Sequence, residues 1–119
     1  MVSADSHVLE PPKLWEERID PSFADRGPRL VSEEKADWWY VDGKRLISVA
    51  AGAQAGIKYR PGESDWRFQT YEARWENVIP GAYIPTEHVK DLDTDGITAA
   101  VLYPTIGLRH FYLVEDTAL

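Results

Sequence analysis

Residues 97–103 form a nearly continuous apolar run, and this run constrains the fold more than any other stretch of the sequence. Its length fits a β-strand that is buried on both faces, and such strands are typical of parallel sheets. A helix is predicted over residues 86–95, because Pro85 stands near its start and Gly96 just past its end. A helix followed at once by a buried strand predicts an α/β fold, either a barrel or a doubly wound sheet.

Another strand is predicted over residues 2–7, at the start of the sequence. Successive side chains of a strand alternate between its faces, so Asp5 and His7 project from the same face. A carboxylate and an imidazole side by side are two of the ligand types that bind Zn²⁺ and similar divalent ions. Because D-x-H also occurs by chance, the alternative is a strand end that carries polar side chains. Together with the helix and the apolar run, this strand predicts a βαβ unit with a right-handed crossover.

The context of this pair resembles a known family. The motif D-S-H-V-x-E-P-P-x-L-W runs from Asp5 to Trp15. A second block covers residues 83–97 and continues at 99–105. Both blocks are similar to the amidohydrolase superfamily, in particular to the amidohydrolase-related branch that includes aminocarboxymuconate-semialdehyde decarboxylase and the dihydroxybenzoate decarboxylases. They occur in the order in which that branch has them.

The resemblance implies a (β/α)8 barrel of the TIM type, with a metal ion bound at the carboxyl end of its strands. It implies that Asp5 and His7 occupy the H-x-H position on the first strand, although many members have a histidine where this chain has Asp5. Zinc is the expected ion and manganese is the alternative, because the carboxylate leaves the identity of the metal open. The other ligands, a later histidine and a later aspartate, are expected outside these 119 residues.

The resemblance also implies an activity. Members of this branch act on small carboxylated or phenolic molecules by hydrolysis or by non-oxidative decarboxylation, so a metal-dependent hydrolase or carboxy-lyase is expected. A complete barrel needs about 250 residues. Residues 1–119 are therefore expected to be the amino-terminal fragment of the barrel, inactive or nearly inactive unless a second chain completes the site. A truncated gene product, or a small domain that has kept the motif for another purpose, are the alternatives.

Further residues are candidates for the site. Glu10 is interpreted either as a hydrogen-bond acceptor that orients the metal-bound imidazole or as a cap of the helix predicted over residues 11–19. Trp15 on that helix is either a wall of a substrate-binding cleft or an anchor of the core or of a lid. His110 follows the carboxyl end of the apolar strand, so a substrate-binding role is open to it. His88 is predicted to be a solvated helix residue.

Three short β elements are predicted at residues 28–32, 37–41 and 44–48. Asp42-Gly43 between the last two is a strong hairpin signal, because a type I′ turn needs positive φ at both central positions. Residues 38–40 place aromatic side chains on both faces of the middle strand. The barrel interpretation makes residues 27–49 a small antiparallel hairpin insertion and residues 50–64 a connector.

The region after the hairpin is predicted to be less regular. Residues 50–56 are small and contain glycine, so they are predicted to be flexible. One uneven helix is predicted over residues 65–78, because apolar residues there have near-helical spacing. Arg60, Arg67 and Arg74 are candidates for binding a substrate carboxylate. The alternative is that they are solvated or salt-bridged arginines without such a role.

The composition argues against several classes of protein. Thirteen basic and 20 acidic residues give a net charge of −7, whereas nucleic-acid binding needs a basic face. The absence of cysteine excludes disulfides, thiolate ligands and a cysteine nucleophile. No apolar run approaches the roughly 18 residues of a membrane span, and the cytoplasm is the expected location.

The expected partners are a small-molecule substrate and either a second copy of the chain, as a homo-oligomer, or the missing remainder of the barrel. The alternative function is a non-catalytic, aromatic-rich module. Such a module would associate with itself through its hairpin and its exposed strand edges.

Overall fold

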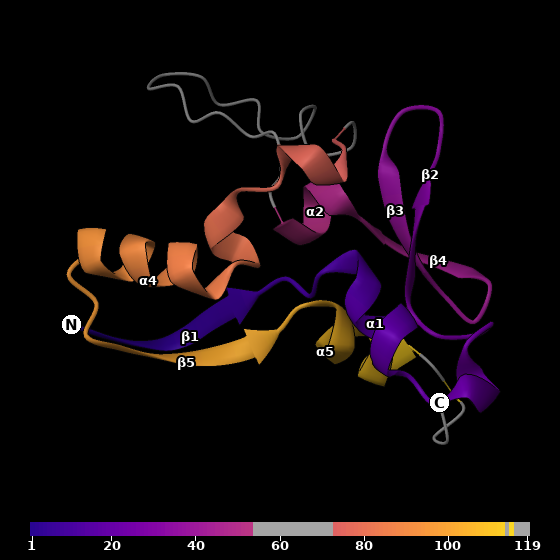
Figure 1. The fold of residues 1–119 in the computed structure, drawn as a ribbon, viewed down its shortest axis with the longest axis horizontal. Coiled ribbons are helices and arrows are strands. Elements are labelled where there is room, and N and C mark those ends of the chain that lie inside the picture. Colours follow the sequence, from indigo (N-terminus) through magenta and orange to yellow (C-terminus); the bar gives the residue numbers. More distant parts are fainter. Residues whose placement is uncertain (54–72, 114, 116–119) are drawn as a thin grey trace.

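The computed structural model describes residues 1–53, 73–113 and 115. These residues form two β-sheets with helices around them (Figure 1). The strands are β1 (Val2–Val8), β2 (Arg29–Ser32), β3 (Asp37–Val41), β4 (Lys44–Ser48) and β5 (Ala99–Pro104). The α-helices are α1 (Pro12–Arg18), α2 (Val49–Ala53), α4 (Pro85–Thr94) and α5 (Ile106–Leu113). The 3₁₀ helices are η1 (Pro21–Phe23), η2 (Trp75–Asn77) and η3 (Pro80–Ala82). Every helix among the described residues is too short or too polar to cross a lipid bilayer.

The first strand of the chain pairs with the last described strand. β1 and β5 form a parallel two-stranded sheet, in which Val2 faces Ala99 and Val8 faces Pro104. α4 precedes β5 in sequence, and Gly96 between them has a φ of +68°, which a glycine adopts without strain. The predicted strand, helix and strand are thus confirmed, and the protein has the predicted mixed α/β class.

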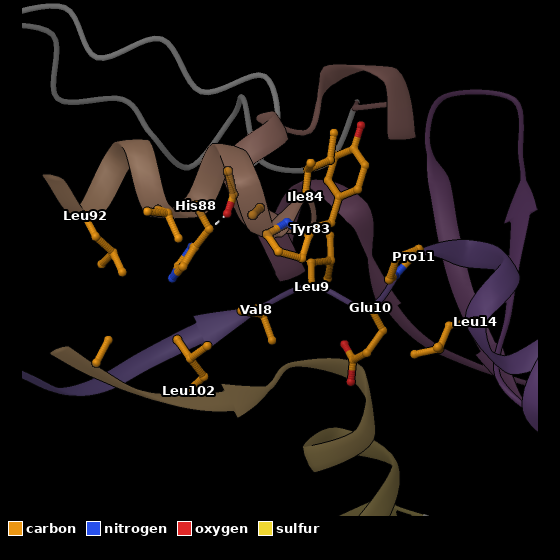
Figure 2. Close-up of a pocket in the computed structure, with 15 residues that line it drawn as sticks. Val8, Leu9, Glu10, Pro11, Leu14, Tyr83, Ile84, His88, Leu92 and Leu102 are labelled. Atoms are coloured by element: carbon orange, nitrogen blue, oxygen red, sulfur yellow. Dashed lines mark hydrogen bonds between the residues drawn. The ribbon is translucent and has the colours of Figure 1, made fainter. Parts of the chain in front are cut away.

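α4 covers one face of the β1–β5 sheet (Figure 1). Leu92 of the helix and Val8 and Leu102 of the strands line a cavity of about 470 Å³ between the helix and the sheet (Figure 2). His7 and Tyr103 are the strand neighbours of Val8 and Leu102, so they lie on the opposite face. Their ring centroids there are 5.9 Å apart.

Both faces of β5 keep exposed surface, so the prediction that residues 97–103 are buried on both faces is wrong. On the α4 side Leu102 is 48% exposed, and the opposite face is open to solvent. Val101 and Tyr103 are 48% and 41% exposed. A parallel sheet is buried on both faces when layers cover it on both sides. Among the described residues, this sheet has two strands and α4 on one side.

The antiparallel sheet confirms the predicted hairpin. Its strand order is β2-β3-β4, and Trp39 in the middle strand faces Leu30 on one side and Ile47 on the other. Asp42 and Gly43 connect β3 to β4 with φ angles of +50° and +72°. These are the two positive values that a type I′ turn requires.

Aromatic side chains lie on both faces of β3, as predicted. Trp39 has no exposed surface and belongs to the core. Trp38 lies on the other face, where the guanidinium of Arg45 stacks over its ring at 4.2 Å from the centroid. Arg45 also pairs with Glu33 at the end of the sheet. The outer aromatic face is therefore partly covered by the chain itself.

A hydrophobic cluster joins the two sheets. Leu9 directly follows β1, Ile106 begins α5, Trp39 comes from β3 and Val49 from α2, and all four are buried. Burial of each such side chain stabilises the fold by about 1.5–3 kcal/mol. The carboxyl ends of β1 and β5 are thereby fixed against the antiparallel sheet.

Residues 50–53, predicted to belong to a flexible connector, are helical. They form part of α2, whose first residue Val49 has no exposed surface. The hydroxyl of Ser48 accepts a hydrogen bond from the Ala51 N–H at 3.1 Å, as an N-cap does. Small side chains let this turn pack closely against the core, which is why the prediction of flexibility is wrong here. The rest of the predicted connector, residues 54–64, lies outside the described residues.

The helix predicted over residues 65–78 lies partly outside the described residues, which resume at Ala73. From there the backbone forms the short 3₁₀ helix η2 and is extended at Val78, so the helix prediction is wrong for this portion. The Asp37 carboxylate accepts a hydrogen bond from the Trp75 N–H at 2.8 Å. This contact with β3 sets the backbone conformation in place of a continuous helix.

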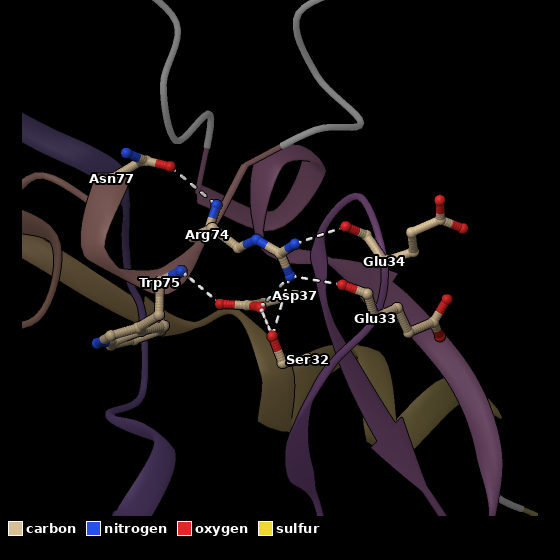
Figure 3. Close-up of polar contacts among 7 residues, drawn as sticks. All are labelled: Ser32, Glu33, Glu34, Asp37, Arg74, Trp75 and Asn77. Carbon is tan, nitrogen blue, oxygen red and sulfur yellow. Dashed lines mark hydrogen bonds and ion pairs between the residues drawn. The ribbon is translucent and has the colours of Figure 1, made fainter.

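Arg74 strengthens the same connection (Figure 3). Its Nη1 donates to Asp37 Oδ1 at 3.0 Å and to the carbonyl oxygen of Glu33 at 2.6 Å. The interpretation of Arg74 as a salt-bridged arginine is therefore confirmed. The other two candidate arginines, Arg60 and Arg67, lie outside the described residues.

Candidate metal centre

β1 brings the two predicted metal ligands together near its carboxyl end. Asp5 Oδ1 and His7 Nε2 are 3.5 Å apart. The side chains are 78% and 47% exposed, so an ion can reach both donor atoms from solvent. They lie on the open face of the β1–β5 sheet, where His7 is next to Tyr103.

A β-bulge shapes the strand just before this pair. Between Ser3 and Ser6, β1 has one more residue than the facing stretch of β5. The hydroxyl groups of Ser3 and Ser6 are hydrogen-bonded at 2.7 Å, although residues three apart point to opposite faces of a regular strand. Asp5 lies between Ser3 and Ser6 in this irregular stretch and still contacts His7, and bulges of this kind often occur next to functional sites.

The spacing of the two donor atoms fits one divalent ion. Zinc binds carboxylate oxygen and imidazole nitrogen at about 2.0–2.2 Å, and two such bonds at a tetrahedral angle separate the donors by about 3.4 Å. Asp5 Oδ1 and His7 Nε2 are 3.5 Å apart. Two bonds at a right angle, as in octahedral coordination at about 2.1 Å, would need a separation of about 3.0 Å. The observed spacing is therefore compatible with two ligands of one divalent ion, since rotation of these exposed side chains can reach either separation.

Two ligands are half of a tetrahedral site. Within residues 1–53, 73–113 and 115, no group of three or more His, Asp and Glu side chains is placed to hold an ion. An open catalytic zinc site normally has three protein ligands. Any working centre built on Asp5 and His7 thus needs at least one further ligand from outside this pair.

Glu10 caps a helix, but a different one from the helix that follows it in sequence. Its carboxylate accepts hydrogen bonds from the N–H groups of Ile106 at 2.9 Å and Gly107 at 2.8 Å. These amides form the N-terminus of α5, so the interpretation of Glu10 as a cap of α1 is wrong. The other interpretation, that Glu10 orients the His7 imidazole, stays a prediction.

Trp15 and His110, predicted separately as substrate-binding residues, line the same cavity. It has a volume of about 320 Å³ and lies between α1 and α5, where Arg18 also lines it. Trp15 Nε1 and His110 Nδ1 are buried and have no hydrogen-bond partner among the described residues. Trp15 also packs against the hydrophobic cluster, which confirms its interpretation as a core residue. Its substrate-binding role stays a prediction.

The electrostatics of this cavity keep its histidine neutral. Burial lowers the pKa of His110 below its ordinary value of 6.5, and the nearby charge of Asp42 offsets this effect only in part. At pH 7 the imidazole is therefore predominantly uncharged and can both donate and accept a hydrogen bond. Together with the indole N–H of Trp15, it offers polar contacts to a small molecule in an otherwise largely apolar cavity.

The prediction that His88 is a solvated helix residue is wrong. Its ring points from α4 toward β1, and its Nδ1 lies 2.9 Å from the carbonyl oxygen of Gly81, to which it donates (Figure 2). Its Nε2 is buried without a partner among the described residues. His88 and Leu92 are spaced i, i+4 and therefore share one helix face. This spacing is the sequence signal that could have placed His88 on the covered side.

Comparison with known proteins does not assign a family. No protein-family model matches this chain, and no curated protein matches it. The amidohydrolase resemblance therefore stays a prediction based on its two motif blocks.

Proposed function

We propose that Asp5 and His7 are the first two ligands of a divalent-metal centre in a hydrolase or carboxy-lyase of the amidohydrolase type. The observation that carries this proposal is the 3.5 Å separation of Asp5 Oδ1 and His7 Nε2 on an open strand face. In this proposal the chain is the amino-terminal part of a (β/α)8 barrel. The enzyme is cytoplasmic and acts on a small carboxylated or phenolic molecule.

The arrangement of β1, α4 and β5 supports the proposal of a barrel. In a (β/α)8 barrel, helices cover the outside of the strands and catalytic residues stand at the strands' carboxyl ends. α4 covers one face of the sheet, and His7 lies on the other face, one residue before the end of β1. Val101 and Tyr103 on that face have the exposed apolar surface that an inner layer of barrel side chains would bury.

The expected chemistry follows from the two proposed metal ligands, Asp5 and His7. A divalent ion bound in such a centre polarises a substrate oxygen or lowers the pKa of a bound water molecule. Asp5 contributes a negatively charged oxygen ligand and His7 a nitrogen ligand. The cavity of Trp15 and His110 lies between α1 and α5, the helices that follow β1 and β5. In this proposal it binds a polar substituent of the substrate. Arg18 at that cavity can pair with a substrate carboxylate.

The isolated chain is expected to have little or no catalytic activity. Two protein ligands leave the ion weakly held, because open catalytic zinc sites normally use three. Activity would require the remaining ligands from further chain or from a partner. Zinc is the favoured ion because it readily takes imidazole nitrogen as a ligand, and manganese is the alternative.

Zinc binding by the purified chain tests the proposal. Asp5→Asn and His7→Ala each remove or weaken one donor, and we expect the zinc affinity to fall by at least about tenfold, since even loss of an outer hydrogen-bond partner costs that much in metal sites. Competition with a chromophoric chelator measures this affinity. Asp93→Asn is the matched control, because Asp93 is an exposed carboxylate on α4.

Two outcomes would count against the proposal. The first is an unchanged zinc affinity in a variant that combines Asp5→Asn with His7→Ala. The second is an equal loss of affinity in Asp93→Asn, which would indicate nonspecific attraction of the cation by a negatively charged chain.

A second candidate function is a non-catalytic module that associates with itself. The exposed apolar side chains of Val101 and Tyr103 favour it, and so do the edges of the β1–β5 sheet, which pair with no further strand among the described residues. Sedimentation of the chain in EDTA separates the two candidates. A dimer that persists without metal, and with both Asp5 and His7 replaced by Ala, would support the module, whereas a monomer in EDTA would contradict it.

A further inference from the structure

The open face of the β1–β5 sheet holds an incomplete metal pair next to exposed apolar side chains. Asp5 and His7 supply two donors, and a tetrahedral ion takes four. Val101 and Tyr103 on the same face are about half exposed. A partner that covers this face and supplies further ligands would both complete the coordination of the ion and bury the apolar side chains.

We propose that this partner is a second copy of the chain, so that one zinc ion joins two Asp5–His7 pairs across a two-fold axis. The inference rests on the proposed function, because it uses the same two ligands. It adds the identity of the partner that supplies the other two.

The geometry of the pair suits a two-fold axis. Opposite edges of a tetrahedron are related by a two-fold axis that passes through its centre. One Asp5–His7 pair spans 3.5 Å, which is close to the length of such an edge. The same pair in a second copy spans the opposite edge. The resulting two carboxylates and two imidazoles are all ligand types of zinc, and the carboxylates balance its double positive charge.

The surroundings of the pair suit contact between identical faces. His7 packs beside Tyr103, whose ring centroid is 5.9 Å away, and Val101 precedes Tyr103 by two residues on the same strand face. A two-fold dimer uses the same patch on both copies. The apolar side chains of one copy therefore meet those of the other around the ion.

Charge makes this contact depend on the ion. Each copy has a formal net charge of −7, and the two Asp5 carboxylates approach each other at the axis. Without a cation these like charges repel, whereas a zinc ion between them attracts both. The dimer is therefore expected with zinc and not in its absence.

The bridged centre is closed. Four protein ligands leave no position for a water molecule or a substrate, which is the arrangement of a structural zinc site. The dimer is therefore a catalytically silent form of the chain. Any segment that supplies the remaining ligands of the proposed enzyme competes with the second copy for the same ion.

Sedimentation equilibrium of the full chain, in EDTA, in zinc and in magnesium, tests this inference. Zinc is expected to double the mass from 13.5 kDa, with one ion bound per two chains, whereas EDTA and magnesium leave it unchanged. Asp5→Asn and His7→Ala are expected to abolish the doubling. Asp93→Asn, the exposed control on α4, is expected to retain it.

Tyr103→Lys provides a second variant that leaves both ligands in place. It adds a positive charge to the contact face of each copy, so the zinc-dependent dimer is expected to be lost. Zinc binding by the single chain is expected to be weaker, because the lysine lies near His7, but still detectable. Far-UV circular dichroism verifies that the variant is folded. An undiminished dimer in folded Tyr103→Lys would overturn the inference.

The remaining outcomes separate the inference from the function on which it rests. One zinc ion per monomer would overturn the second-copy inference and leave the proposed function intact. A dimer of equal strength in EDTA would also overturn the inference. Failure of the wild-type chain to bind zinc at all would overturn both.

Discussion

Glu10 ties the first part of the chain to the last described helix through one side chain. The residue is 7% exposed, and its two oxygens accept hydrogen bonds from the first amides of α5. A negative charge is favoured at a helix N-terminus because the helix dipole is positive there. Space at this contact is limited, since a Cβ at Gly107 would approach Glu10 Oε1 to 3.2 Å.

Replacement of this carboxylate is expected to destabilise the protein. Glu10→Gln keeps the shape but loses the charge and places an amide donor near two N–H groups, so we expect the free energy of unfolding to fall by about 1–2 kcal/mol. Urea unfolding monitored by circular dichroism measures the change. Glu16→Gln is the control, because Glu16 is exposed on α1. Equal effects of the two substitutions would contradict the capping role.

Asp37 is the other carboxylate on which the fold depends. Burial raises its pKa, but hydrogen bonds from the Trp75 N–H, the Ser32 hydroxyl and Arg74, together with the charge of Arg74, outweigh that effect. The pKa of Asp37 in the folded protein is therefore below its ordinary value of 3.8. A depressed pKa means that the ionised carboxylate stabilises the folded state above the unfolded pKa, and that this stabilisation is lost as the pH falls through the folded pKa.

Asp37→Asn is therefore expected to have a pH-dependent effect. At pH 7 it should lower the free energy of unfolding by about 2 kcal/mol, the usual scale for a hydrogen bond to a charged group. The difference from the wild type should shrink as the pH falls from neutrality through 3.8 and below, because the wild-type carboxylate is then protonated. Urea titrations across this range measure it. A difference that stays constant with pH would show that the charge of Asp37 has no part in stability.

Among individual residues, sequence could predict the contacts that are local. The convergence of Asp5 and His7 follows from the alternation of a strand, which needs no knowledge of the rest of the fold. The helix that Glu10 caps could not be predicted, because its amides are 96 residues away along the chain. The same limit applies to Asp37, whose partner Arg74 is 37 residues away.

Among the secondary-structure elements, the β3–β4 hairpin depends most directly on its turn. Gly43 has a φ of +72°, and a Cβ there would meet no atom within 4 Å. A substitution is therefore opposed by backbone strain and not by crowding. We expect Gly43→Ala to destabilise the protein by about 1 kcal/mol, the cost of a left-handed conformation for a residue with a Cβ.

Gly52→Ala is the matched control for this prediction. Gly52 lies within α2, where a Cβ would make ordinary contacts with Ile47 at 3.8 Å. Because glycine inside a helix costs about 0.5–1 kcal/mol relative to alanine, this substitution should be neutral or stabilising. Thermal unfolding of both variants measures the contrast. A smaller loss in Gly43→Ala than in Gly52→Ala would contradict it.

The elements that could be predicted are those with signals inside their own residues. Asp42-Gly43 specifies its turn, and Pro85 and Gly96 bracket α4. α2 could not be predicted in this way, because its small residues form a helix through packing on the core. η2 is likewise set by a hydrogen bond from another element, the Asp37 carboxylate.

At the scale of the whole molecule, the hydrophobic cluster makes the two sheets one unit. Ile106 has no exposed surface and lies in the cluster with Trp39 of the antiparallel sheet. Ile106→Ala is expected to lower the free energy of unfolding by about 3 kcal/mol, because it removes buried methylene groups and leaves a cavity. Val89→Ala on α4 should change it by less than about 0.5 kcal/mol, since Val89 is 55% exposed.

The cooperativity of unfolding tests whether the hydrophobic cluster joins the two sheets into one unit. Tryptophan fluorescence reports on all five tryptophans, of which Trp15, Trp39 and Trp75 lie in or against the hydrophobic cluster. Far-UV circular dichroism reports on all helices and strands. The two transitions are expected to coincide in the wild type and in Ile106→Ala. Separate transitions would show that the β1–β5 unit and the antiparallel sheet unfold independently.

The parallel sheet shows why burial was harder to predict than secondary structure. The apolar run at residues 97–103 correctly predicts a strand, because its residue types suit one. Whether Val101 and Tyr103 are buried depends on what packs against them, and the run itself contains no such information.

The pairing of β1 with β5 also has a kinetic consequence. Val2 and Ala99 become neighbours in the sheet after closure of a loop of nearly the whole chain. Such a loop is costly in entropy, so this sheet is expected to form late in folding. During synthesis on the ribosome, the strand that carries Asp5 and His7 can pair with β5 only after β5 has emerged.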